Sequence, residues 1–163
     1  MSLKGLSDQQ VVEQIEAQEA RLVFDSFSIS QAHEIGLRLL ELGRQRTLPI
    51  AIDVTRNGQC LFHSALEGAT LDNAQWVQRK MRVVQRFSHS SLYMGALCRV
   101  KGVSLEEKYL LPLNEFAAHG GAFPVTVRGA GVIGSVTVSG LPQIDDHELV
   151  VSVLEQQLAT TQA

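Results

Sequence analysis

The chain of 163 residues has little cysteine, no long apolar run and no excess of basic charge. Its two cysteines, Cys60 and Cys98, are too few for a disulfide framework, and neither belongs to a C-x-x-C pair. Fourteen Lys and Arg against seventeen Asp and Glu give a net charge of −3, which argues against nonspecific binding of nucleic acid. No apolar run approaches the roughly 18 residues that span a bilayer, and residues 1–6 lack the hydrophobic core of a signal peptide. We therefore expect a cytoplasmic protein that binds neither nucleic acid nor a membrane.

The composition that remains is that of a folded protein. About 45% of the residues are hydrophobic and 19% are charged, which excludes intrinsic disorder. A chain of this length corresponds to one domain. We expect a single domain over residues 1–163, with residues 1–5 flexible.

Helix signals occur at intervals along the chain. Ser7 and Gln10 have the spacing of a capping box, which predicts a helix up to about Ala20, and a short strand follows at 21–24. A second helix is expected to begin near Ser28 or Ser30. The further predicted helices are 70–87, 90–100 and a C-terminal helix that Asp145 caps with Glu148.

Two β-hairpins are predicted between the helices. Runs 50–56 and 59–65 flank Asn57-Gly58, the strongest short hairpin signal, and runs 123–128 and 132–139 flank Gly129-Ala130. A two-residue turn places Ile52 opposite His63, Val54 opposite Leu61 and Thr55 opposite Cys60. Two hairpins and one further strand predict a five-stranded antiparallel sheet between helical layers, an α/β fold of the α+β type.

Lys80 is the most informative charged residue. At 100° per residue it falls inside the apolar arc of the helix 70–87, where all its same-face neighbours are apolar. One interpretation is that its amine reaches water past a packed stem; the other is that it binds a carboxylate or phosphate in a pocket. The first predicts that Lys80→Met is neutral, and the second predicts weaker ligand binding. Arg79, Arg82 and Arg86 form a stripe that is typical of a solvated face.

The loop His119-Gly120-Gly121 is a second candidate site. Successive glycines after a helical segment allow positive φ and close approach of the backbone to another group. His119 could contact a ligand or a metal, or it could simply follow a helix end. The five histidines and two cysteines show no zinc-ligand spacing, so no metal site is predicted.

Two other motifs have structural explanations. Gly129, Gly131 and Gly134 have G-x-G-x-x-G spacing, but a strand and not a helix follows, so we reject a dinucleotide site and assign Gly134 to close packing. His147 beside Asp145 could act as a general base, although helix capping already explains the carboxylate. No nucleophile elbow is present, so the catalytic residues, if any, stay unknown and enzyme activity stays open.

Three segments together resemble a known family. They are Trp76 to Lys80 with Arg86 to Ser91, Ala118 to Pro124, and Gly131 to Gln143 with Asp146-His147. Over about residues 20–160 the chain resembles the haem-degrading domain family of HbpS-like proteins, and in particular uncharacterised protein family 0303. The resemblance implies a profilin-like α/β/α domain, a homo-oligomer, and haem as a conceivable cofactor.

The residues and the resemblance together lead to three functional hypotheses. The first is an oligomeric domain that binds a small anionic or tetrapyrrole-like ligand. The alternatives are an adaptor that binds another protein through its oligomeric surface and an enzyme that acts on haem or a corrinoid. The candidate ligand-binding residues are Lys80, Arg79, His119, Gly120, Gly121 and His147.

Overall fold

A five-stranded sheet with the strand order β1-β4-β5-β2-β3 lies at the centre of the computed structural model, which describes residues 1–161. The strands are β1 (Val23–Phe24), β2 (Ala51–Arg56), β3 (Gln59–Ala65), β4 (Ala122–Val127) and β5 (Gly131–Ser139). The helices are α1 (Asp8–Arg21), α2 (Ile29–Gln45), α3 (Leu71–Phe87), α4 (Ser91–Val100), α5 (Leu105–Tyr109) and α6 (Gln143–Thr161).

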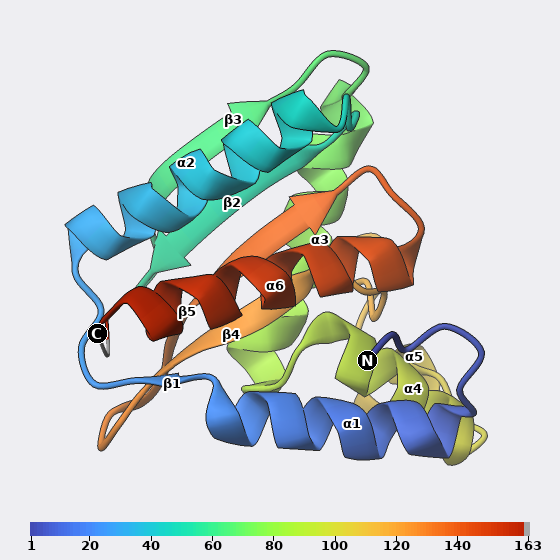
Figure 1. Ribbon diagram of the computed structural model, residues 1–163. Helices are drawn as coiled ribbons and strands as arrows, with labels where there is room; N and C mark the ends of the chain where they lie inside the picture. Colours follow the sequence, from blue (N-terminus) through green and yellow to red (C-terminus); the bar gives the residue numbers. More distant parts are fainter. Residues whose placement is uncertain (162–163) are drawn as a thin grey trace.

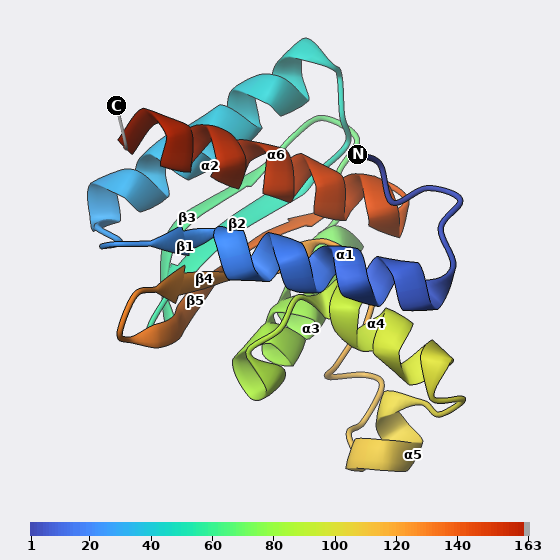
Figure 2. The ribbon, with the colours of Figure 1, turned by 60° about the horizontal axis from the view of Figure 1, so that its bottom comes forward.

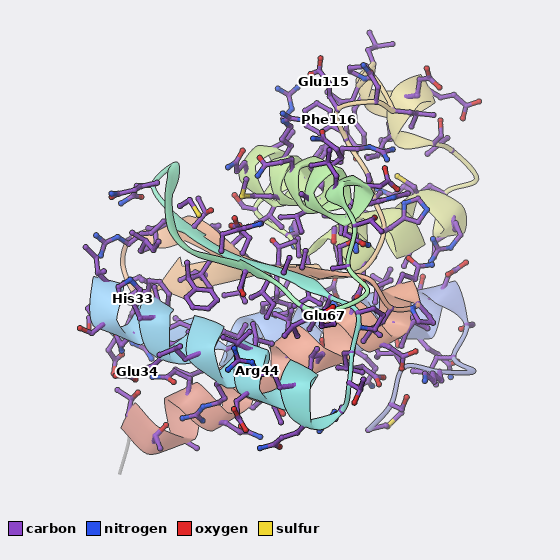
Figure 3. The ribbon with its side chains drawn as sticks, turned by 90° about the horizontal axis from the view of Figure 1, so that it is seen from above. His33, Glu34, Arg44, Glu67, Glu115 and Phe116 are labelled. Atoms are coloured by element: carbon purple, nitrogen blue, oxygen red, sulfur yellow. The ribbon has the colours of Figure 1, made fainter. Side chains whose placement is uncertain are left out.

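The elements form three layers. Figure 1 shows α2 and α6 across one face of the sheet, and Figure 3 shows α3 on the opposite face. In Figure 2, α1 lies along α4, beside α3. This arrangement confirms the predicted α/β/α domain with five strands.

The sheet is mixed, however, and the prediction of a purely antiparallel sheet was wrong in this detail. Val23 and Phe24 of β1 pair in parallel with Thr126 and Val127 of β4. Only strands joined by a tight hairpin must be antiparallel. The chain between β1 and β4 contains α2, the β2–β3 hairpin and the helices α3 to α5. Such a long connection leaves the relative direction of β1 and β4 free, and tertiary packing decides it.

The β2–β3 hairpin has the predicted turn but a different register. Asn57 and Gly58 have φ of 49° and 79°, as a two-residue hairpin turn requires. Thr55 faces Cys60 as predicted, but a bulge follows, so that Val54 faces Phe62 and not Leu61. A bulge inserts one residue into one strand, which also moves the partner of Ile52 from His63 to Ser64.

Helix starts show how far local signals reach. Ser7 with Gln10, and Ser28 with Gln31, form complete capping boxes. The predicted cap at Asp145 was wrong because α6 begins two residues earlier, at Gln143. Glu148 accepts a hydrogen bond from the backbone N–H of Leu3 instead.

Tertiary contacts also involve the first residues of the chain. We predicted that residues 1–5 are flexible, yet the Leu3 side chain is buried in the cluster between α1 and α4, and Lys4 pairs with Asp145. Among residues 1–161, no helix has the length and apolar composition that crossing a membrane requires.

The two cysteines differ in exposure. Both thiols are free, but Cys60 is exposed on the edge strand β3, whereas Cys98 is buried in α4, so the prediction that both are buried was wrong for Cys60. We expect Ellman's reagent to modify one thiol of the native protein rapidly and the second only on unfolding. Cys60→Ser should abolish the rapid phase and Cys98→Ser should leave it; equal rates for the two thiols would contradict the structure.

Candidate functional site

A cavity of about 260 Å³ lies between the first half of α3, the loop before β4 and the turn from β5 into α6. The turn is at the upper-right end of β5 in Figure 1. The lining residues are Asn73, Trp76, Lys80, His119, Ser139, Gly140, Leu141, Gln143 and Asp146. The cavity therefore collects side chains from segments that are far apart in the sequence.

A buried ion pair forms the floor of this cavity. Lys80 is 3% exposed, and its Nζ donates to Oδ2 of Asp146 at 2.9 Å and to the carbonyl oxygen of Val138 at 3.2 Å. Asp146 also accepts the backbone N–H groups of Gly140 and Leu141. The amine of Lys80 therefore does not extend into solvent, and a carboxylate of the chain itself already pairs with it. Ligand binding by Lys80 stays a prediction.

Burial and pairing act in opposite directions on this pair. Burial lowers the pKa of Lys80, and the charge and hydrogen bond of Asp146 oppose that shift. Burial likewise raises the pKa of Asp146, against Lys80 and the two backbone N–H groups. The pair therefore depends on both partners, because either charge alone would be buried without compensation.

Two glycines let the loop approach the ion pair. Gly121 has φ +134°, and a Cβ there would lie 2.8 Å from Nζ of Lys80 and 2.3 Å from the carbonyl oxygen of Val138. A Cβ at Gly120 would lie 2.1 Å from the carbonyl oxygen of Gln143. Any side chain at either position would displace the backbone that forms the cavity.

Aromatic rings form the outer wall. The indole of Trp76 contacts the imidazole of His119 edge-on, with 5.3 Å between ring centroids. The exposed His119 has a lowered pKa, first because of partial burial and then because of the positive charges of Lys80 and Arg79. Its ring is therefore mainly neutral at pH 7.

Two side-chain amides at the rim carry hydrogen-bond donors that have no partner within the described residues. Oδ1 of Asn73 accepts the backbone N–H of Thr70, and Oε1 of Gln143 accepts that of Gly120. The NH₂ group of each of these amides has two donors, and neither group has a partner among residues 1–161. The Lys80 ammonium has three N–H groups, of which two are used within the protein.

The structure brings only some of the predicted site residues together. Lys80 and His119 line the cavity, and Gly120 and Gly121 shape it. Arg79 lies over the Trp76 ring but donates through Nε to the carbonyl oxygen of Leu113, so it anchors the loop outside the cavity.

His147 lies elsewhere, in the protein interior. Its Nε2 is 2.8 Å from Oε1 of Gln18, and its ring packs edge-on against Phe123. Its Nδ1 has no partner within residues 1–161. His147 is therefore a core residue and no general base for this cavity.

Of the nine lining residues, the sequence analysis named only Lys80 and His119 as ligand-binding residues. Among the others, Gln143 and Asp146 belong to the segments that carry the family resemblance, whereas Asn73 belongs to no motif. The helical segment expected before Gly120 was also wrong, because residues 110–118 form no helix. A hydrogen bond to α3 holds the backbone of residues 110–118, because the carbonyl oxygen of Arg79 accepts the N–H of Ala117.

The fold and site define a class, a three-layer α/β/α domain with a small polar cavity where β5 turns into α6. The profile of the haem-degrading protein HbpS-like family matches residues 27–155. The chain is 52% identical over 145 residues to a UPF0303 protein of Streptomyces avermitilis, and the match covers 89% of each chain. It is 51% identical over 140 residues to a UPF0303 protein of Paraburkholderia phytofirmans, and that match covers 86% of this chain and 85% of that protein. The chain belongs to the HbpS-like haem-degrading family.

Solved structures agree with this assignment. The crystal structure of Ybr137w protein superimposes with a TM-score of 0.85 at 34% identity, covering 93% of this chain and 90% of that one. The crystal structure of HbpS gives 0.63 at 17% identity over 81% and 89% of the two chains. The PduOC:heme complex gives 0.66 at 16% identity over 80% and 94%. The last two similarities show the shared fold.

Haem is the cofactor that this family implies, and the cavity of one chain does not fit it. Among the lining residues, His119 alone is of a type that ligates haem iron. The cavity volume of about 260 Å³ is below the roughly 300–1,000 Å³ of sites for drug-sized ligands, and a haem with four pyrrole rings is large on that scale. In the described part of the chain, no group of three or more His, Cys, Asp or Glu is arranged to hold a metal ion.

Proposed function

We propose that this chain is a binding domain for a small anionic molecule, held in the cavity between α3, the His119 loop and α6. The observation that carries the proposal is a group of unpaired donors at one cavity, namely the NH₂ groups of Asn73 and Gln143 and the third N–H of Lys80.

The proposed ligand is a carboxylate or phosphate of metabolite size. Because Asp146 neutralises Lys80, the floor holds no uncompensated charge, and the rim donors provide the attraction. The Trp76 and His119 rings would contact the rest of the ligand. Isothermal titration with acetate, succinate and inorganic phosphate tests the proposal, and saturable binding to none of them would contradict it.

Gln143→Glu should weaken the binding of the best of these probes at least tenfold. The variant keeps the oxygen that accepts the Gly120 N–H and replaces the NH₂ donors by a carboxylate oxygen, which repels an anion. Gln75→Glu adds the same charge at an exposed position on α3 that does not line the cavity. An equal loss of affinity in both variants would mean that net charge, and not the site, controls binding.

Haem processing and protein binding are the competing functions. Titration with haemin, followed by absorbance, distinguishes them: a Soret shift that His119→Ala abolishes would favour the haem hypothesis. The homo-oligomer and the cytoplasmic location that the sequence analysis predicted stay predictions.

A further inference from the structure

A second cavity, of about 400 Å³, lies at the opposite end of α3 from the proposed anion site. It is formed by the last turn of α3, the β2–β3 turn and the first half of β5. The lining residues are Thr55, Asn57, Gly58, Val84, Gln85, Ser88, Val132, Ile133, Gly134 and Ser135, and none of them lines the first cavity.

A buried, unpaired hydroxyl group faces this cavity. Ser135 is 1% exposed, and its Oγ has no hydrogen-bond partner in the part of the chain that the structure describes. Its neighbour Val136 belongs to the core under α2 and α6, so Ser135 faces the α3 side. A polar group that is buried without a partner is unfavourable unless something satisfies it.

The second hydroxyl of the cavity can only accept. Thr55 donates its single O–H to Oδ1 of the buried Asp53 at 2.6 Å, so only its lone pairs remain for a ligand. Cys60 and His63 approach the other oxygen of Asp53, at 3.5 and 3.4 Å. The Asp53 carboxylate therefore lies directly behind the hydroxyl of Thr55 and makes it a better acceptor.

The C-terminal end of α3 adds a partial negative charge, which has the same sign as the Asp53 carboxylate. Gln85 belongs to the last turn of this helix and Ser88 is its C-cap. The C-terminal end of a helix carries a partial negative charge and favours cations. No Lys or Arg among residues 1–161 lines this cavity.

We propose that this cavity binds a small primary amine in its ammonium form. The acceptors are Oγ of Ser135 and Oγ1 of Thr55, and the carbon atoms of the amine contact Val84 and Val132. This inference is independent of the proposed anion site, because the two cavities share no residue.

An NMR titration of the nitrogen-15-labelled protein at pH 7 with butylammonium tests the proposal. We expect saturable shifts of the amides of Thr55, Ser135 and Ser88. Butanol, the neutral analogue, should bind at least fivefold more weakly, and butyrate should produce no saturable shifts there. Equal affinity for butanol, or no saturable shifts with butylammonium, would overturn the proposal.

Two variants of β5 separate a ligand-binding hydroxyl from a merely buried one. Ser135→Ala should weaken butylammonium binding at least tenfold without loss of thermal stability, because the hydroxyl it removes is unpaired. Thr137→Val removes another buried, unpaired hydroxyl from the same face of the sheet, outside the cavity. Thr137→Val should leave the affinity within twofold of wild type, and equal effects of the two variants would exclude Ser135 as a ligand group.

Discussion

Replacement of Lys80 by Met is expected to destabilise the fold by about 3–5 kcal/mol, the cost of leaving one partner of a buried ion pair uncompensated. The methionine side chain keeps most of the packing of the lysine stem. Asp146, however, is 0% exposed and loses the only cation that it contacts among the described residues. Urea unfolding at pH 7 measures the change. The apolar surroundings of Lys80 alone had predicted no loss at all.

Two comparison variants separate the effect of breaking the ion pair from the effect of removing a lysine side chain. Lys101→Met removes an exposed lysine at the end of α4 and should change the stability by less than about 0.5 kcal/mol. The double variant Lys80→Met with Asp146→Leu should recover part of the loss, because it removes both charges together. A change of less than about 1 kcal/mol in Lys80→Met would contradict a pair that needs both partners.

The second large effect is a loss of stability in mild acid that depends on His147. Burial lowers the pKa of His147 from 6.5 to about 3 in the folded protein, whereas the unfolded chain titrates near 6.5. Between these values the unfolded state binds more protons, so its population rises as the pH falls. At 1.36 kcal/mol per pH unit, we expect a loss of about 2–3 kcal/mol between pH 7 and pH 4.5 from this residue.

The measurement is urea unfolding of the wild type and two variants at pH 7, 5.5 and 4.5. His147→Gln removes the titrating ring and should be less sensitive to acid, whereas His33→Gln changes an exposed histidine of α2 (Figure 3) and should follow the wild type. The raised pKa of His89, caused first by its hydrogen bond to Glu19, has the opposite sign and is common to both variants. Parallel pH curves for the two variants would contradict a neutral, buried His147.

The Lys80 pair also bears on ligand choice. An ion pair that is already neutral cannot discriminate by charge alone, so the rim amides of Asn73 and Gln143 decide which anion fits. Loss of Lys80 should therefore reduce stability and also remove one donor of the proposed site, whereas changes of Asn73 or Gln143 should reduce affinity alone. The rim variants thus test ligand binding without the loss of stability that a Lys80 variant carries.

The sequence by itself determined the features that depend on neighbouring residues. The capping box at Ser7, the helix start near Ser28 and the Asn57-Gly58 turn were predictable because their hydrogen bonds and φ angles are satisfied within four residues. The alternation of helices with two hairpins then indicated a sheet between helical layers. The motif resemblance, spread over most of the chain, indicated the family.

Only the tertiary structure decided the features that depend on distant partners. The direction of β1, the bulge beside Thr55 and the burial of His147 follow from packing between segments that the local pattern does not relate. Lys80 and Asp146 are 66 residues apart, and neither the lysine on its apolar face nor the aspartate in its helix start indicates the other. A buried charge must be compensated, but the sequence does not say by which residue, because the geometry that brings the two charges within 2.9 Å exists only in the folded chain.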